Sequence, residues 1–418
     1  MFGSSLDGEV FRPGSPGYES VRRPVNPAFR DVRPRLVVRC RSVADVVATL
    51  EHAHRTGERL AVRGGGHCFA GRSSTDGIVL DVSTMDDIEV VGPAAIGGGA
   101  RLSRVYSALH AHGCTLPAGC GPTVGLAGLT LGGGIGLLGR EHGLTCDRLI
   151  GAQVVLADGR VVDCDGEREP DLFWALRGGG GGHFGVVTSL RFDPVPSPVM
   201  IRVEAVATDG LADLVSAWQS WAPDAPDGLT VNLTLTSSPG EPVVARLFGA
   251  STLIEERTRS LLPGLSLRAG LTVPELKRSF TEPPDERPVR IRSEFFAEAL
   301  PDRTLVDLLD GLAEPRNSGR RELAFTAMGG AYNRVAAEAT AFAHRSERFL
   351  LEHNGDAPWV DRSWATVHDS GRVYPNFPDP ALADEATAYH GANLTRLKAI
   401  KRAYDPGEFF VSHLTEEP

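Results

Sequence analysis

The first structured stretch of the chain places one amphipathic segment between two apolar runs. The runs 36–38 and 60–62 are typical of short buried strands. Between them, over residues 43–50, apolar side chains recur at helical spacing. Ser42 is a suitable N-cap for this helix and Gly57 a suitable end. The pattern therefore predicts a strand, a helix and a second strand in succession.

Further elements follow up to residue 195. Asp158-Gly159 separates two β-branched runs, which predicts the turn of a β-hairpin. The remaining predicted elements of this half are strands over 78–82, 152–156, 160–162 and 185–190, and helices over 102–113 and 170–176.

The pattern changes after residue 195, where three prolines lie within 194–199 and glycines become fewer. Longer runs of alternating polarity then predict an antiparallel sheet with helices on one face. Examples are strands over 230–235 and 289–293 and a helix over 303–313, and a final helix is predicted over 381–403. We therefore expect an α+β protein of two or three domains with a boundary near residue 195.

Composition and charge restrict the class of protein. Hydrophobic residues make up 42% of the 418 positions and charged residues 23%, which is typical of a globular protein. The net charge is −10 and no basic stripe stands out, so we expect no nucleic-acid partner. The sequence shows no secretory leader and no apolar run of bilayer length, so we expect a cytoplasmic protein without a membrane partner.

Cysteine usage indicates neither a disulfide framework nor a metal site. All six cysteines lie in the first 164 residues, without a CxxC pair or histidines at zinc spacing, so we expect no bound metal. Disulfide frameworks are typical of shorter secreted chains, and most of these thiols are expected to be free and buried.

Three glycine-rich segments carry the candidate chemistry. Successive glycines lack side chains, so their backbone N–H groups can close around an anion. Residues 64–66 directly follow a predicted strand and form either a pyrophosphate cradle or a tight turn. Together with segments 125–136 and 178–182, they indicate one extended ligand touched at many backbone points, such as a dinucleotide.

Two common nucleotide-binding motifs do not explain these glycines. Gly134, Gly136 and Gly139 match GxGxxG, but no β-branched strand precedes them and Asp158 lies in a predicted turn. No GxxxxGK[ST] is present, so the sequence does not predict P-loop chemistry.

Four motifs, in order, give the chain a wider resemblance. RSVADVVATLEHAHRTGERLAVRGGGHCFAG resembles a pyrophosphate loop with a flavin-linking histidine, and PTVGLAGLTLGGGIGLLGREHGLTCDRLIGAQVVLADG resembles a second flavin-binding stretch. DLFWALRGGGGGHFGVVTSLRF resembles the end of an FAD domain, and VYPNFPDP with YHGANLTRLKAIKRAYDP resembles the C-terminal elements that complete it. Over nearly its whole length the chain is thus similar to the FAD-linked oxidases of the vanillyl-alcohol oxidase superfamily, in the branch of berberine bridge enzyme.

The resemblance implies a domain organisation. It implies a two-part PCMH-type FAD-binding domain, formed by residues 1–195 and completed by 374–418. The inserted substrate domain, 196–373, would be an antiparallel sheet covered by helices.

The resemblance also implies the cofactor site. FAD would be bonded through its 8α-methyl group to His67, a linkage that raises the reduction potential of the flavin. The implied cofactor-binding residues are Arg63, Gly64, Gly65, Gly66, His67, Cys68, Gly71, Cys120, Thr123, Val124, Gly125, Gly128, Gly133, Gly134, Gly136, Val187 and Asn393.

Cysteine forms a second flavin bond in some relatives, where it directly precedes Pro-Thr-Val-Gly. Gly121 holds that position here and Cys120 comes one residue earlier. Cys120 is therefore either a free thiol beside the ring or a second link to the flavin. Cys68 replaces a serine that is frequent in relatives and is interpreted as a packing substitution.

Three residues are candidate catalytic groups. Relatives carry Tyr-x-Asn-Tyr, which reads Tyr374-Pro375-Asn376-Phe377 here, so only the first tyrosine remains to help deprotonate a substrate or to line the pocket. Glu352 and His353 are neighbours on a predicted strand, and alternation allows only one of them to face the flavin.

The implied reaction is hydride transfer from a carbon bearing OH or NH to the flavin, with O₂ as the oxidant. A small organic substrate and O₂ are the expected partners. An oxygenase, a dehydrogenase and a non-catalytic flavin-binding protein are the alternatives. The sequence does not indicate the oligomeric state.

Overall fold

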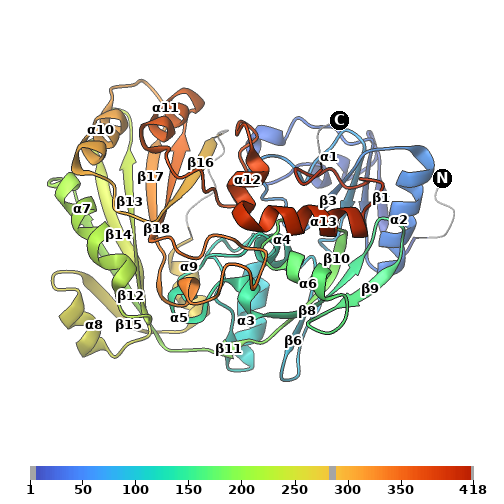
Figure 1. The fold of residues 1–418 in the computed structure, drawn as a ribbon, viewed down its shortest axis with the longest axis horizontal. Coiled ribbons are helices and arrows are strands. Elements are labelled where there is room, and N and C mark those ends of the chain that lie inside the picture. Colours follow the sequence, from blue (N-terminus) through green and yellow to red (C-terminus); the bar gives the residue numbers. More distant parts are fainter. Residues whose placement is uncertain (1–5, 282–288, 416–418) are drawn as a thin grey trace.

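The structure is a computed structural model that describes residues 6–281 and 289–415. Two sheets form the N-terminal half, drawn in blue to green in Figure 1. The first has the order β1-β2-β4-β3, in which β2, β4 and β3 are parallel; its strands are β1 (Glu9–Phe11), β2 (Leu36–Arg39), β3 (Leu60–Arg63) and β4 (Ile78–Asp81). The second is antiparallel, in the order β5 (Ile88–Val90), β6 (Ala94–Gly97), β10 (Val186–Phe192), β8 (Leu149–Val155) and β9 (Val161–Cys164).

The helix between β2 and β3 shows how closely local sequence determines the bounds of an element. The helix α2 (Val43–Thr56) begins after Ser42, whose hydroxyl accepts the Asp45 N–H, while the Asp45 carboxylate accepts the Ser42 N–H. Gly57 ends it with a φ of 66°, a conformation that glycine adopts without strain. The predicted strand, helix and strand are therefore all present. The other helices of this half are α1 (Tyr18–Val21), α3 (Leu102–Ala111), α4 (Leu126–Leu131), α5 (Gly139–His142) and α6 (Pro170–Leu176).

A short antiparallel pair joins the two halves: β11 (Val195–Pro196) pairs with β7 (Cys114–Thr115). The chain then forms a seven-stranded antiparallel sheet in the order β15-β12-β14-β13-β17-β18-β16. Its strands are β12 (Met200–Ala207), β13 (Leu229–Ser237), β14 (Val244–Ser251), β15 (Ser266–Leu271), β16 (Arg290–Phe296), β17 (Arg321–Ala327) and β18 (Phe349–Gly355).

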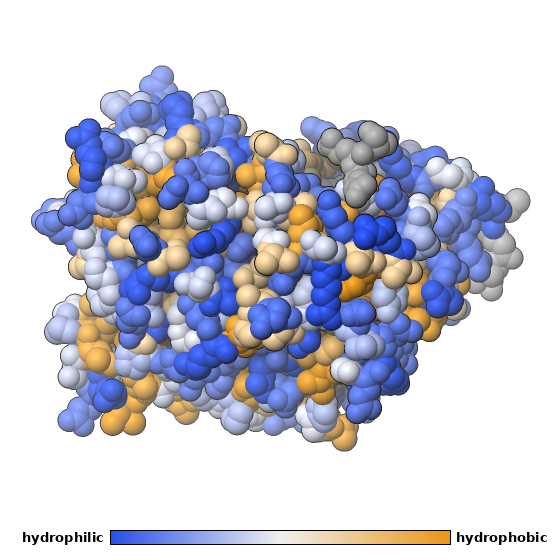
Figure 2. Space-filling model, in the orientation of Figure 1, coloured by the Kyte–Doolittle hydropathy of each residue, from blue (hydrophilic) through white to orange (hydrophobic). Residues whose placement is uncertain are grey.

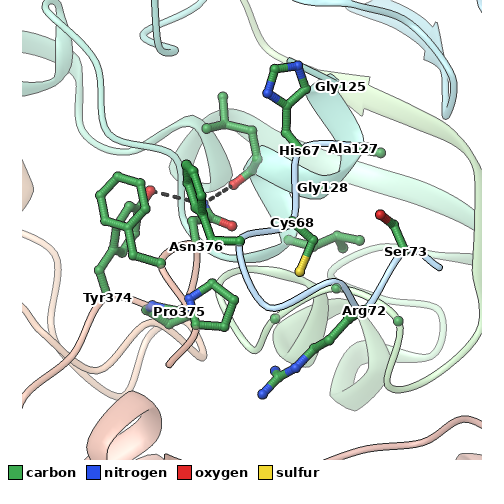
Figure 3. A pocket seen from close by; sticks show the side chains of 18 of the residues that line it. His67, Cys68, Arg72, Ser73, Gly125, Ala127, Gly128, Tyr374, Pro375 and Asn376 are labelled. Atoms are coloured by element: carbon green, nitrogen blue, oxygen red, sulfur yellow. Dashed lines mark hydrogen bonds between the residues drawn. The ribbon is translucent and has the colours of Figure 1, made fainter. Parts of the chain in front are cut away.

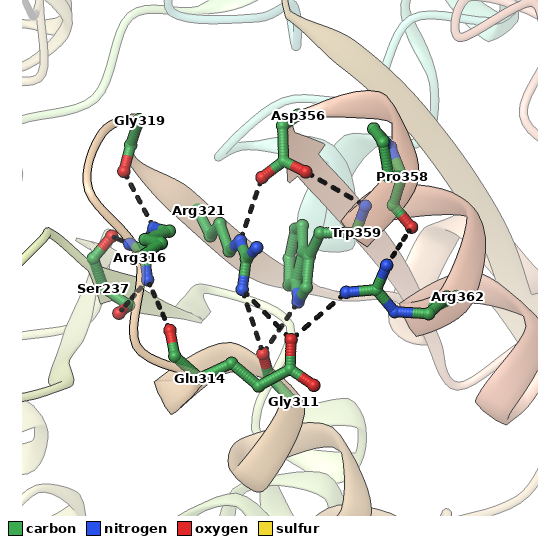
Figure 4. A network of polar contacts seen from close by, with 10 residues as sticks. All are labelled: Ser237, Gly311, Glu314, Arg316, Gly319, Arg321, Asp356, Pro358, Trp359 and Arg362. Carbon is green, nitrogen blue, oxygen red and sulfur yellow. Dashed lines mark hydrogen bonds and ion pairs between the residues drawn. The ribbon is translucent and has the colours of Figure 1, made fainter.

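Helices cover the outer face of this sheet, at the left of Figure 1. They are α7 (Leu211–Trp221), α10 (Asp302–Ala313) and α11 (Ala357–Val367), while α8 (Glu255–Leu261) and α9 (Val273–Ser279) lie near β15 and β12. Alternate strand residues such as Leu233, Phe325 and Leu351 pack beneath them in one apolar core. Polar contacts at the end of this layer add to the packing: Arg321 pairs with Asp356 at 3.0 Å (Figure 4).

The C-terminal segment returns to the N-terminal half. The single helix expected over 381–403 is wrong, because the chain forms α12 (Glu385–His390) and α13 (Leu394–Tyr404) with a break at Gly391. Gly391 has φ 46° and ψ −128°, values outside the helical region, so no continuous helix can pass through it. In Figure 1 both helices, in red, lie against the N-terminal half, and Arg396 pairs with Asp171 of α6 at 2.7 Å.

The two halves confirm the α+β fold class, with helices on one face of an inserted antiparallel sheet. Figure 2 shows polar and charged residues over most of one face, with apolar residues in small separate groups. Within the described ranges, no helix has both the length and the apolar character that a bilayer span requires.

Candidate active site

A cavity of about 1360 Å³ lies between the glycine-rich loops and the inner face of the seven-stranded sheet. It exceeds the roughly 300–1,000 Å³ of ordinary small-molecule sites, so it has room for an extended cofactor together with a substrate. Of the predicted cofactor residues, those that line it are Gly64, Gly65, Gly66, His67, Cys68, Cys120, Val124, Gly125, Gly128, Gly136 and Val187.

The first two glycine-rich segments meet at this cavity. A Cβ added to Gly65 would lie 2.2 Å from the backbone nitrogen of Gly125, and one added to Gly125 would lie 2.5 Å from the nitrogen of Gly65. No other residue can occupy either position without moving a backbone. The glycines therefore bring two loops 60 positions apart in sequence into contact beside one ligand site.

His67 lies at this contact. Its ring points toward Gly125, and Arg72 points the other way (Figure 3). The Nε2 atom of His67 is 2.9 Å from the Thr123 hydroxyl oxygen. Burial and, secondarily, the charge of Arg101 lower the pKa of His67, so its imidazole is neutral at pH 7. A neutral imidazole has one nitrogen with a free lone pair, as a covalent bond to an electrophilic carbon requires. Thr123 itself does not line the cavity. It contacts His67, which does.

Arg63 does not point into the cavity, contrary to its predicted role in cradling pyrophosphate. Its guanidinium is buried and donates to the carbonyls of Ser73 and Val21 at 3.0 and 2.8 Å and to the Ser74 hydroxyl at 2.7 Å. All three nitrogens are thus used within the protein. Arg63 holds the shape of the loop, and backbone groups are left to face a ligand.

Three predicted glycines also lie behind the cavity wall, where side chains exclude a Cβ. One added to Gly71 would lie 2.5 Å from Phe29, and Gly133 and Gly134 are similarly close to Phe342 and Thr145. All three have φ between 71° and 111°. They are required for the turns that carry the lining residues.

Asn393 is also wrongly placed by the prediction. Its side-chain amide is buried and donates to the carbonyls of Ala337, Thr340 and Ala341 at 2.8, 3.2 and 3.4 Å. It fixes the loop before β18 and is not among the residues that line the cavity.

Tyr374 does line the cavity, and Figure 3 shows the hydrogen bond between its hydroxyl and Asn376. The hydroxyl oxygen accepts the N–H groups of Gly134 and Ile135, each at 3.1 Å, and the Asn376 amide at 2.9 Å. Burial raises the pKa of Tyr374 to about 12, although these three bonds act in the opposite direction. Tyr374 is therefore a phenol at pH 7. Its acceptor capacity is used, and only its proton remains available.

Glu352 and His353 lie on opposite faces of β18, as their alternation requires. Glu352 lines the cavity, and no hydrogen bond joins its carboxyl to another residue in the described parts of the chain. Burial and the nearby Glu322 raise its pKa to about 8. His353 is fully buried on the helix side, with Nδ1 2.9 Å from the Ser363 hydroxyl, so it does not line the cavity and its prediction as a catalytic base is wrong.

Sequence reasoning missed the polar side chains that the sheet presents to the cavity. Thr230 and Asn232 of β13 and Thr326 of β17 line it beside Glu352, together with the apolar Phe248 of β14. The Thr230 hydroxyl is buried without a hydrogen-bond partner among the described residues. The alternation of residues 230–235 was visible in the sequence, but nothing in it indicated which face would be covered by the other half of the chain.

Cys120 lies in the wall beside a buried cation that the sequence also did not indicate. The Lys277 ammonium donates to the Ala118 carbonyl at 2.6 Å and interacts with the Cys120 thiol. Lys277 comes from α9, beyond β15, so this contact fixes a loop of the N-terminal half against a helix that follows a strand of the seven-stranded sheet.

The residues around the cavity fit FAD. Glycines of two touching loops line the cavity without side chains, and a neutral histidine stands where a covalent bond is expected. Residues 34–165 match the family described as FAD binding domain, and residues 373–414 match the family described as berberine and berberine like. The fold and the site therefore define an FAD-linked oxidoreductase.

Known proteins extend this match over the whole chain. FAD-linked oxidoreductase YgaK from Bacillus subtilis is 33% identical, over 97% of this chain and 96% of the relative. Glucooligosaccharide oxidase from Acremonium strictum, described as carrying a 6-S-cysteinyl, 8α-N1-histidyl FAD, is 26% identical with a TM-score of 0.88 over 99% of this chain and 97% of that one. The fold of BBE-like 1 from Physcomitrella patens is equally similar, with a TM-score of 0.88 over 98% of each chain at 24% identity. The chain belongs to the berberine bridge enzyme-like family of FAD-linked oxidoreductases.

Proposed function

We propose that this protein is an oxidase that removes a hydride from an alcohol carbon of a small organic substrate, with FAD bonded to His67 and O₂ as the oxidant. The observation that carries the proposal is the Glu352 carboxyl, which faces the same cavity as His67 and Tyr374 and has no hydrogen-bond partner among the described residues. FAD, when bound, supplies the hydride acceptor.

Glu352 is the proposed base. Oxidation of an alcohol to a carbonyl compound releases a hydride and a proton, and the proton needs an acceptor at the cavity wall. A carboxylate with a pKa of about 8 is well matched to this task near neutral pH, because it is partly ionised there and still basic enough to take a proton. Tyr374, with a pKa of about 12, is a phenol under the same conditions and cannot serve as the acceptor.

The remaining wall residues orient the substrate. The proton of Tyr374 is available to a substrate oxygen, because the oxygen of its hydroxyl is already occupied by three donors. Thr230, Thr326 and Asn232 add neutral hydrogen-bonding groups on the sheet side. An alcohol is favoured over an amine because, with its pKa raised to about 8, Glu352 is largely uncharged at pH 7 and offers no full negative charge to an ammonium group.

The similarity to glucooligosaccharide oxidase makes carbohydrate alcohols the first substrates to test. The experiment mixes the purified flavoprotein anaerobically with cellobiose, benzyl alcohol and benzylamine in turn and follows bleaching of the flavin absorption. Air is then admitted and peroxide is measured. An alcohol that bleaches the flavin and yields peroxide supports the proposal. Bleaching by the amine alone contradicts the alcohol assignment, and bleaching without peroxide identifies a dehydrogenase.

A further inference from the structure

The wall segment 373–379 carries Tyr374 and Asn376 but belongs to no helix or strand. The Asn376 amide donates to the Leu129 carbonyl and to the Tyr374 hydroxyl, each at 2.9 Å. These contacts fix the two side chains, but the path of the backbone on either side of them depends on residues outside the segment. Strand β16, at the edge of the seven-stranded sheet, supplies anchors at both ends of the segment.

The anchor before the segment is Glu294, which is completely buried. One carboxylate oxygen accepts the N–H groups of Asp369, Ser370 and Gly371 at 3.1, 2.7 and 3.0 Å, and the Ser370 hydroxyl at 2.8 Å. The other oxygen lies 2.7 Å from Nδ1 of His368. A single side chain thus satisfies most of the polar groups of a tight loop.

The anchor after the segment is Asp379, which is 2% exposed. Its carboxylate pairs with Arg292 at 2.6 Å and Arg290 at 3.1 Å, and its N–H donates to the Tyr389 hydroxyl at 2.7 Å. Both arginines belong to β16, as does Glu294. The wall segment is therefore held at both of its ends by side chains of one strand.

The residues between the loop held by Glu294 and Tyr374 are themselves fixed by backbone hydrogen bonds. The Arg372 carbonyl accepts the Phe295 N–H at 2.8 Å, and the Val373 N–H donates to the Ala388 carbonyl at 2.9 Å. Every residue from 369 to 373 is therefore bonded, and a displacement of the loop passes directly to the Tyr374 backbone. Misplacement of a reacting or orienting group by about 1 Å can cost on the order of 100-fold in rate.

We propose that Glu294 is a positioning residue for the reaction, acting through the loop 368–372 on Tyr374 and Asn376. This inference rests on the proposed function only for the role of Tyr374 toward substrate; the anchoring itself is independent of it. Glu294 touches neither the cavity nor a ligand, and its effect is carried by the course of the backbone.

Asp45 offers a matched control. It is 2% exposed, close to the complete burial of Glu294, and its carboxylate accepts the N–H groups of Asp7, Arg41 and Ser42 at 2.8, 2.8 and 3.2 Å. It caps α2 and does not line the cavity. Removal of either carboxylate takes the acceptor away from several part-buried backbone N–H groups, so both changes destabilise the fold by the same mechanism.

The experiment compares the flavin-loaded Glu294→Ala, Glu294→Gln and Asp45→Ala variants with the wild type. The readouts are hydrogen–deuterium exchange of residues 368–376, visible circular dichroism of the bound flavin, and kcat and KM for cellobiose. We expect Glu294→Ala to exchange faster in this segment, to alter the flavin dichroism and to lower kcat 10- to 100-fold with KM within threefold. Glu294→Gln keeps an acceptor for the loop and returns kcat to within threefold of the wild type. Asp45→Ala loses a similar amount in Tm, with kcat and dichroism unchanged.

Two results would overturn the inference: wild-type exchange and dichroism in Glu294→Ala, or an equal fall of kcat in Asp45→Ala. If Glu294→Ala does not fold, Ser370→Ala removes one donor to the same carboxylate and is expected to lower kcat two- to fivefold with the same dichroic change. Wild-type dichroism in Ser370→Ala would equally count against the inference. If no alcohol reduces the wild-type flavin, the proposed function fails, while exchange and dichroism still decide whether Glu294 fixes the segment.

Discussion

The Nε2 atom of His67 lies 2.9 Å from the Thr123 hydroxyl oxygen, across the contact between the two glycine-rich loops. If Nε2 carries the proton and donates it to Thr123, the lone pair is left on Nδ1. The lowered pKa of His67 keeps the ring neutral, so this lone pair is available at pH 7. In the tautomer whose Nε2 donates to Thr123, Nδ1 is therefore the nitrogen that can be attached to the flavin.

Removal of the histidine should abolish covalent attachment, and removal of the hydroxyl should slow it. We expect His67→Ala to release all its flavin on acid denaturation. Thr123→Val should attach flavin several-fold more slowly than the wild type, because the ring loses the contact that fixes its tautomer. The measurement is flavin fluorescence of the protein band on a denaturing gel. Thr84→Val, which removes a bond to the Cys40 carbonyl away from the cavity, is the control and should attach flavin normally. A fluorescent His67→Ala band would show that another residue holds the flavin.

Replacement of the proposed base should remove the proton acceptor without changing the shape of the site. We expect Glu352→Gln to slow anaerobic flavin reduction by about 10²- to 10⁴-fold, the usual contribution of a general base. The covalent flavin and its absorption spectrum should be unchanged. Reduction within threefold of the wild-type rate, followed by stopped flow with the same alcohol, would exclude Glu352 as the base.

The pH profile gives an independent test of the same residue. Glu352 has to be ionised to accept a proton, so kcat/KM should rise about tenfold per pH unit and level off above an apparent pKa near 8. Glu322 contributes to this raised pKa, and Glu322→Gln should therefore shift the profile to lower pH without lowering the plateau. A profile that is flat from pH 6 to 9, or one that does not move in Glu322→Gln, would contradict the assignment.

A side chain at Gly128 should affect cofactor binding without affecting folding. Apart from its chain neighbours and the backbone of its own helix, no described atom lies within 4 Å of a Cβ added there, yet the residue lines the cavity from within α4. Gly128→Ala should therefore fold with equal or higher Tm, since alanine favours a helix over glycine by about 1 kcal/mol, and lose flavin because the methyl group enters the cavity. The measurements are Tm and the ratio of flavin to protein absorption. Gly311→Ala, at an equally open helical position of α10, should keep its flavin. Full flavin content in Gly128→Ala would mean that the cofactor does not lie against this position.

The fold was predictable from the sequence where signals are local. Ser42, Asp45 and Gly57 determine the bounds of α2 without help from the rest of the chain, and Asp158-Gly159 lies in the turn between β8 and β9 as expected. The break at Gly391 was missed because the apolar spacing continues across it. One glycine with a non-helical φ and ψ ends a helix that the surrounding pattern extends.

The site was predictable only in part, because the direction of a side chain depends on residues far away in the sequence. Motifs located the glycine loops and His67 because these act through backbone and position in the chain. They did not show that Arg63 and Asn393 turn away from the cavity, since their direction depends on carbonyl groups of distant segments. The anchor Glu294 carries no motif, and only the edge position of β16 brings it to the wall that holds Tyr374.

Histidine burial should make the protein acid-sensitive. Burial and then Arg72 lower the pKa of His413 to about 3, and burial and then His413 lower that of His390 well below its usual range. Arg72 can only donate to His413 Nδ1, at 3.1 Å, so His413 is neutral and its Nε2 donates to His390 Nε2 at 2.8 Å. Protonation of either ring would place two donors against each other, which explains why the folded state holds them neutral.

The sign of the effect follows from proton binding. Below the unfolded pKa of about 6.5 the unfolded chain binds protons that the native state does not, so the free energy of unfolding falls as pH drops from 6.5 toward 3 and is at its full value above 6.5. At pH 5 one such histidine lowers stability by about 2 kcal/mol relative to neutral pH. We expect His413→Gln to lose about 2 kcal/mol less than the wild type between pH 7.5 and pH 5 in urea unfolding, even if it is less stable at pH 7.5. His110→Gln, at an exposed position, should respond to pH as the wild type does. An identical pH response in His413→Gln would mean that this cluster is not the source of the acid sensitivity.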